Sequence, residues 1–104
     1  MTATLAEEFA RGRMYFELKD FIGAAHILAP VVTAEPGNVA ARLLLARAYY
    51  HSAQLGRAEA ELRAVVELAP TEEYAHLLLG RTLQRASRHT EAEPYLRLHA
   101  AMTG

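Results

Sequence analysis

The chain has 104 residues, of which 52% are hydrophobic and 22% are charged, and its formal net charge is −1. This length suits one compact domain or a short repeat array, and the hydrophobic content excludes a simple disordered chain. The balanced charge provides no strong field for nucleic acid or for an anionic membrane surface. The absence of cysteine excludes disulfides and thiolate metal sites.

The N-terminal segment, residues 1–8, lacks the basic stretch and apolar run that mark a secretory signal. The longest strongly apolar segment, residues 21–34, contains His26 and Pro30. It is too short to cross a bilayer as a helix. We therefore expect a soluble cytoplasmic protein with no membrane partner and no nucleic-acid partner.

The chain predicts an all-α fold of six helices, because Ala, Leu, Arg and Glu dominate and all favour helix. The predicted helices cover residues 5–18, 21–35, 39–53, 55–69, 72–86 and 90–102. Side chains that can cap a helix N-terminus precede several of them: the capping boxes Thr4–Glu7 and Thr90–Glu93, and the single caps Asn38 and Thr71. Pro30 predicts a kink in the second helix, whereas Pro94 falls in the first turn of the sixth, where no backbone bond is lost.

Several residue series recur with a period of 34. They are Gly12, Ala46 and Gly80; Ala24, Ala58 and Ala92; Leu28, Leu62 and Leu96; Tyr15 and Tyr49; Pro36 and Pro70. A period of this size indicates stacked supersecondary units. Each unit contains two of the predicted helices, and the small residues predict points where two helices cross closely.

This pattern resembles the tetratricopeptide repeat. The resemblance covers essentially the whole chain, as one domain (1–104) of three repeats at about 5–38, 39–72 and 73–104. It implies a right-handed α-solenoid in which the first helix of each repeat lines a concave groove. The chain departs from the family pattern where Glu8, Arg42 and His76 replace the usual tryptophan, and the third repeat lacks a closing proline.

Catalytic and metal-binding patterns are not found in the sequence. The five histidines form no pair four residues apart, there is no HExxH motif, and all six glycines are isolated. Ser52 follows His51 directly, but neighbours on a helix point in different directions. We therefore expect no catalytic residue, no metal site and no cofactor.

Three rows of residues on the expected groove also repeat every 34 positions. They are Phe9, Leu43 and Leu77; Arg13, Arg47 and Arg81; Phe16, Tyr50 and Gln84, with Arg85 beside the third row. Arginine is abundant here and is also a common surface residue. A second interpretation is that the arginine row recognises carboxylates through its planar fork. Glu17 is placed to neutralise Arg13, so we expect the C-terminal end to attract anions most.

The rows favour a protein-interaction adaptor that binds a peptide with acidic and apolar residues. The family's carboxylate clamps, which bind acidic chaperone tails, use Lys and Asn at positions that here hold Phe9, Arg13, Leu44, Leu77 and Arg81. Three of these five are apolar, which argues against a chaperone tail. A small DNA-binding helix–turn–helix regulator is a weaker alternative, because the chain has no basic recognition helix.

A further alternative is a self-assembling structural unit. The segment 21–34 has no charged residue, which predicts either a tolerated alanine-rich surface or an interface with a second copy through Ala25, Ile27, Ala29 and Val32. No seventh helix follows residue 102 to cover the last repeat. We therefore expect partial exposure of Leu78, Tyr95, Leu98 and Met102, or their cover by a partner.

Overall fold

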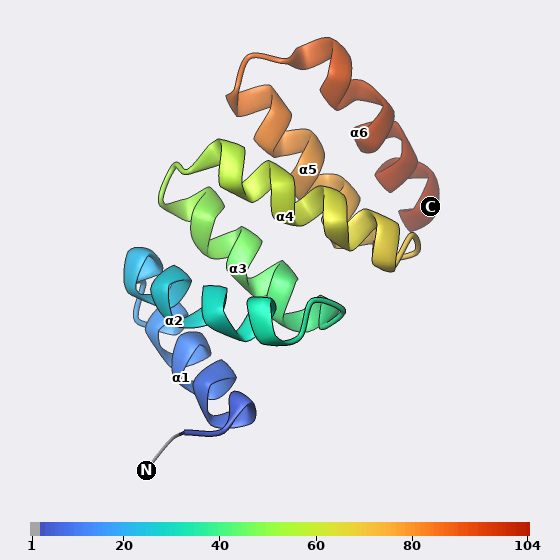
Figure 1. Cartoon of the computed structure of the whole chain (residues 1–104). Coiled ribbons are helices and arrows are strands. Elements are labelled where there is room, and N and C mark those ends of the chain that lie inside the picture. Colours follow the sequence, from blue (N-terminus) through green and yellow to red (C-terminus); the bar gives the residue numbers. More distant parts are fainter. Residues whose placement is uncertain (1–2) are drawn as a thin grey trace.

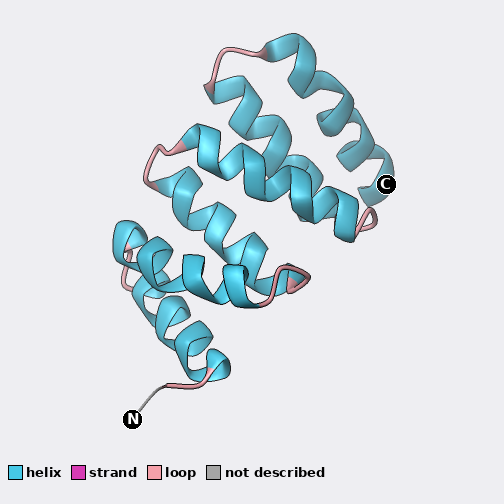
Figure 2. Cartoon of the chain, viewed as in Figure 1, coloured by secondary structure: helices cyan, strands magenta, loops and turns pink. Residues whose placement is uncertain are grey.

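The computed structural model describes residues 3–104, which form six helices and no strand (Figures 1 and 2). The helices are α1 (Leu5–Glu17), α2 (Phe21–Ala34), α3 (Val39–His51), α4 (Leu55–Leu68), α5 (Glu73–Arg85) and α6 (His89–Thr103). All six expected helices are present, and their ends lie within two residues of the predicted positions. Each helix packs against the next along the chain, and α1 also contacts α3, so the helix pairs stack into a solenoid.

Two of the predicted N-terminal caps are confirmed. The Thr4 hydroxyl accepts a bond from the Glu7 amide at 3.1 Å while the Glu7 carboxylate accepts one from the Thr4 amide at 3.4 Å, which completes a capping box. The Asn38 side chain accepts a bond from the Ala41 amide at 3.0 Å. These bonds satisfy amides that have no partner inside the helix.

The caps predicted for the third repeat are wrong. α5 has Glu72 at its N-cap, and α6 begins at His89 with Arg88 at its N-cap; neither N-cap side chain makes a capping bond. Pro94 therefore lies in the second turn of α6, where its missing amide leaves the carbonyl four residues earlier without a helical donor. The helix starts earlier than predicted because Arg88 is held by ion pairs to neighbouring side chains.

The first helix of every repeat ends in the same strained turn. The residue two positions after each helix has a positive φ although it is not glycine: Lys19 (64°), Ala53 (60°) and Ser87 (62°). The following amide bonds back to the carbonyl five residues earlier, at 2.9, 2.8 and 2.8 Å, which is the Schellman arrangement usually made with glycine. The 34-residue period therefore extends to backbone conformation.

Two apolar clusters form the core. One lies among α1, α2 and α3, and the other lies among α3, α4, α5 and α6. The periodic small residues lie at the helix crossings: Ala24, Ala58 and Ala92 are all fully buried. A Cβ atom placed on Gly12 would lie 2.6 Å from Cγ of the buried Leu28, and one on Gly80 would lie 2.7 Å from Cγ of Leu96. The crossings are therefore too close for larger side chains.

Packing within the chain accounts for the buried part of the uncharged helix α2, whereas Ile22 is 61% exposed and His26 and Pro30 are exposed as well. Ala25, Ile27 and Val32 are 5%, 8% and 6% exposed, because α2 is covered by α1 on one side and α3 on the other. Three of the four expected self-association residues are thus buried, and only Ala29 is half-buried. The helix continues through Pro30 to Ala34, and the kink expected there stays a prediction.

The C-terminal end is covered better than expected. Leu78 is buried at 4% exposure, Tyr95 and Met102 are half-buried, and Leu98 alone of the four is exposed, at 45%. The expectation of exposure is therefore wrong for Leu78. α5 carries Leu78 into the second core cluster, so no partner is needed to cover it.

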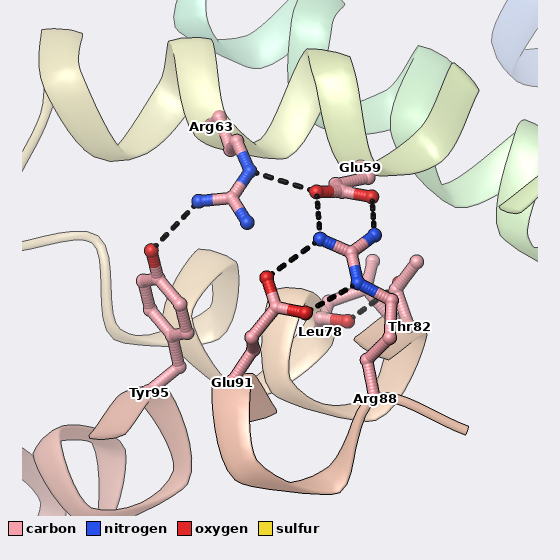
Figure 3. A network of polar contacts seen from close by, with 7 residues as sticks. All are labelled: Glu59, Arg63, Leu78, Thr82, Arg88, Glu91 and Tyr95. Atoms are coloured by element: carbon pink, nitrogen blue, oxygen red, sulfur yellow. Dashed lines mark hydrogen bonds and ion pairs between the residues drawn. The ribbon is translucent and has the colours of Figure 1, made fainter. Parts of the chain in front are cut away.

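A polar network joins the second repeat to the third (Figure 3). The Arg88 guanidinium lies between two carboxylates, donating to Glu59 at 2.6 and 3.2 Å and to Glu91 at 2.7 Å through two nitrogens. Arg63 also donates to Glu59, at 2.9 Å, and to the Tyr95 hydroxyl at 2.9 Å. The bonds from Arg88 lower the pKa of Glu59 below its ordinary value of 4.5, so the charged form is stabilised.

We predict that Gly12→Leu lowers the free energy of unfolding by about 2 kcal/mol, because the new side chain forces α1 away from Leu28. Gly56→Ala is the control, since a Cβ there meets nothing within 4 Å and alanine favours helix. Urea denaturation followed by circular dichroism measures both. Equal effects of the two substitutions would contradict a crossing limited by side-chain size.

The strained turns generate a second prediction. Ala53→Gly should raise the free energy of unfolding by about 1 kcal/mol, because glycine adopts a positive φ without the steric cost borne by alanine. The same substitution at exposed Ala10, in the middle of α1, should lower it by a similar amount. Opposite signs in thermal and urea unfolding are expected; a loss of stability in both variants would contradict strain at Ala53.

Candidate functional site

The ten expected groove residues all lie on the first helices of the three repeats. They are Phe9, Arg13 and Phe16 on α1, Leu43, Arg47 and Tyr50 on α3, and Leu77, Arg81, Gln84 and Arg85 on α5. None of these ten side chains is fully buried. Arg47 of α3 contacts Phe16 of α1, and Arg85 of α5 contacts Tyr50 of α3. We call the surface formed by these ten residues the first-helix face.

Arg47 occupies the middle of the first-helix face. Its guanidinium carbon lies 4.6 Å from the ring centroid of Phe16 on α1 and 5.6 Å from that of Tyr74 on α5. These distances are typical of cation–π attraction. Arg47 is half-buried, and its Nε is buried without a hydrogen-bond partner among the described residues. This side chain of the second repeat thus links an aromatic ring of the first repeat to one of the third.

The other arginines of the face differ in how firmly they are held. Arg85 donates to the Tyr50 carbonyl at 2.9 Å, and its guanidinium lies 4.6 Å from the Tyr50 ring centroid. Arg13 lies 5.0 Å from the ring of Phe9, one turn earlier on the same helix. Arg81 is exposed and makes no ion pair or cation–π contact with the residues described. The arginines of this face therefore range from Arg85, which is fixed by a hydrogen bond, to Arg81, which has no such contact in the described part of the chain.

Ion pairing divides the ten arginines of residues 3–104 into two groups. Five of them pair with a carboxylate: Arg11, Arg42, Arg63, Arg88 and Arg97. The four on the first-helix face make no such pair in the described part of the chain, and neither does Arg57. Glu17, expected to neutralise Arg13, makes no ion pair with it, so that expectation is wrong. The first-helix face therefore concentrates uncompensated positive charge in a protein of net charge −1.

The positive charge of the first-helix face affects the pKa of the nearby His51. Its ring stacks on Phe21 with centroids 4.7 Å apart and meets Phe16 edge-on at 5.8 Å. Desolvation at this position, followed by repulsion from Arg47 and Arg85, lowers the pKa of His51 below its ordinary value of 6.5. The neutral imidazole is therefore the favoured form on the first-helix face.

Tyr74 belongs to the site although the sequence did not mark it. The residues 34 and 68 positions earlier are Ala40 and Ala6, so Tyr74 is not part of a periodic aromatic series. The structure brings its ring against Arg47, with 37% of the residue exposed. An unusual aromatic at an otherwise small groove position was the available signal.

The remaining polar groups include no cluster of metal ligands in the part of the chain that the structure describes: no three His, Asp or Glu side chains there are grouped so that they could hold a metal ion. His76, at a position where the family usually has tryptophan, is buried, and its Nε2 lies 2.8 Å from the Pro70 carbonyl. It serves to tie the start of α5 to the preceding turn. None of the described helices has both the length and the apolarity needed to cross a bilayer.

Comparison with known proteins identifies the class. A family model described as "Tetratricopeptide repeat" matches residues 15–82, well over half of the chain, and the chain belongs to this family. No curated protein sequence matches it. The expected fold, an all-α solenoid of three such repeats, is confirmed.

Solved structures of the protein MamA share the fold. MamA AMB-1 superposes with a TM-score of 0.92 at 21% identity, covering 96% of this chain and 59% of that one. MamA MSR-1 gives 0.91 at 20%, with 96% and 57% covered. MamA 41-end from Desulfovibrio magneticus RS-1 gives 0.87 at 26%, with 92% and 54% covered. The chain thus spans little more than half the length of these three structures.

We predict that the His51 imidazole titrates below pH 6.5 and that Arg47→Ala or Arg85→Ala raises its pKa, because each removes a repelling charge. Arg97→Ala, on the far helix α6, is the control and should leave it unchanged. Because the folded pKa is lowered, protonation favours the unfolded chain, so stability should fall as the pH drops through 6.5. NMR titration of the ring protons measures the pKa; a value at or above 6.5 in the unaltered chain would contradict the prediction.

Proposed function

We propose that this protein is an interaction module that holds a segment of a partner polypeptide along the first-helix face. The ligand's carboxylates lie against Arg81, Arg85 and Arg47, and its apolar side chains lie against Phe9, Leu43 and Leu77. The observation that carries the proposal is that the arginines of this face have no carboxylate partner within residues 3–104.

The pairing pattern supports a ligand because, in the described part of the chain, every arginine outside this face except Arg57 is paired with a carboxylate. Half of the ten arginines already have a carboxylate within 4 Å, and the chain has twelve acidic residues to supply such partners. Acidic side chains are nevertheless scarce on the first-helix face. A ligand carboxylate would restore the balance through a charge-assisted bond to a planar guanidinium.

The spacing of the repeats favours a particular ligand pattern. Packed helices lie about 8–10 Å apart, and an extended chain advances about 3.3 Å per residue. One guanidinium would therefore meet about every third ligand residue. The half-buried row of Phe9, Leu43 and Leu77 offers apolar contact between these charges. Acidic residues that alternate with leucine or phenylalanine fit this surface.

A synthetic peptide with glutamate at every third position and leucine beside each tests the proposal. Fluorescence anisotropy should show binding that weakens with salt, and Arg81→Ala should raise the Kd by about tenfold, or about 1.4 kcal/mol. Binding should also raise the pKa of His51, since a ligand carboxylate offsets the repelling arginines.

Two controls isolate the surface. The peptide with glutamine in place of glutamate should bind poorly, and Arg97→Ala, which removes an ion-paired arginine on α6, should leave the Kd unchanged. A Kd that is unchanged both by Arg81→Ala and by replacing glutamate with glutamine in the peptide would rule out carboxylate recognition on this face. Failure of the glutamate peptide to bind at millimolar concentration would do the same.

A further inference from the structure

The second helices of the first two repeats enclose a groove on a different surface from the first-helix face. α3 contacts both α2 and α4 and lies between them along the stack, so that the two second helices are separated from each other (Figure 1). The space between them measures about 830 Å³. One wall is a stripe of α2 at helical spacing, including Ile22, Ala25, Ala29 and Pro30, and Tyr49 of α3 also lines the space. We call this the α2–α4 groove.

The next pair of second helices provides an internal comparison, because it is built from the same positions one repeat later. Between α4 and α6 the hollow shrinks to about 440 Å³. There Glu59 and Arg63 project from α4 and join Arg88, Glu91 and Tyr95 in the network of Figure 3. Side chains of the chain itself thus bridge this second space.

The α2–α4 groove lacks those bridging groups. The residues 34 positions before Glu59 and Arg63 are Ala25 and Ala29, which are too short to reach across. The residues equivalent to Arg88 and Glu91 are Gln54 and Arg57, and both line the groove. The first groove therefore has polar side chains on the α4 side, although their charges differ from those of Arg88 and Glu91, and it has no bridging group on the α2 side.

Arg57 is the polar group left without a counter-charge. Its Nη1 donates to the Gln54 side chain at 2.9 Å, and Arg57 makes no ion pair with any described residue. None of the ten residues that line the groove is acidic. Burial raises the pKa of the Tyr49 phenol above its ordinary value of 10, Arg57 acts in the opposite sense, and Glu61 adds to the rise. Both charges therefore lie near this partly desolvated ring, but the Glu61 carboxylate is already paired with Arg42. The groove is apolar along α2 and positive at the end near Arg57.

We propose that the α2–α4 groove binds the apolar face of an amphipathic helix from a partner protein, with a carboxylate of that helix on Arg57. The bound helix would provide a carboxylate for Arg57 near the start of α4, just as Glu59 provides one for Arg88 at the start of α6. Its apolar side chains fill the volume beside Ala25 and Ala29, where α4 instead presents long polar side chains.

A helix fits this groove better than an extended segment. The wall on α2 runs from Ile22 to Ala34, about 18 Å at 1.5 Å per residue, which matches three to four turns of a docked helix. This wall offers few hydrogen-bonding groups apart from His26 and Thr33. An extended backbone would lose hydrogen bonds against it, whereas a helix satisfies its own.

Selection from a phage-displayed library of amphipathic helical peptides tests the proposal on the whole chain. The library varies the apolar stripe among Ala, Leu, Ile, Met and Phe, and offers Glu, Gln or Lys at the flanking positions. We expect enriched peptides to carry Glu and to bind, as synthetic peptides in fluorescence anisotropy, with Ala29→Arg weakening them about tenfold or more. This variant places at position 29 the same side chain that Arg63 provides at the equivalent position of α4, beside the smaller hollow.

Charge reversal keeps the test valid if Ala29→Arg fails to fold. Arg57 is exposed, so Arg57→Glu should preserve the circular dichroism spectrum while shifting the preference of the selected peptides from Glu to Lys. Ala60→Arg places an arginine on α4 beside the second hollow and is the matched control, with no expected effect. Arg81→Ala should also have none, which separates this groove from the first-helix face.

Several results would overturn the proposal. One is a library that yields no enriched peptide; another is binding indifferent to both Ala29→Arg and Arg57→Glu. Binding lost in Arg81→Ala would assign the peptides to the first-helix face. Sedimentation showing a dimer that Ala29→Arg dissociates would make a second copy of this chain the occupant instead.

Discussion

Close crossing of helices at small residues is the constraint on which the rest of the structure depends. Ala24, Ala58 and Ala92 are fully buried, and Gly12 and Gly80 face Leu28 and Leu96 at distances that leave no room for a Cβ. Three helix pairs with the same crossing stack in one regular array. The stacking places the first helices on one surface and leaves space between the second helices on another. Both candidate binding surfaces therefore follow from the size of a few buried side chains.

The sequence predicted the parts of the fold that every repeat must share. Small residues at crossings and leucines in the core recur every 34 positions because the packing at each crossing is the same. The same period extends to the turns, where Lys19, Ala53 and Ser87 adopt a positive φ, but their side chains gave no sign of it. Glycine would have marked these turns, and none of the three is glycine.

What could not be predicted depends on contacts that differ between repeats. Arg88 fixes the start of α6 through Glu59 on another repeat, so the local capping box of Thr90 was misleading. The apolar pattern of α2 does not by itself reveal that the helix packs against α3 as well as α1, because α3 belongs to the next repeat. Tyr74 contacts Arg47 across two helices, and its periodic equivalents are alanines. The ten groove residues were named from the period, whereas their unequal restraint is visible only in three dimensions.

The aromatic contacts of Arg47 and Arg85 also bear on the thermodynamics of complex formation. A free arginine side chain samples many rotamers, and fixing it on binding has an entropic cost of about 2 kcal/mol. Arg47 already lies between two rings, and Arg85 is already bonded to a carbonyl. A ligand that meets these two finds them ordered in advance, whereas one that meets Arg81 must order it. Complexes formed at the centre of the face should thus show a smaller entropic penalty in calorimetry than those formed at its edge.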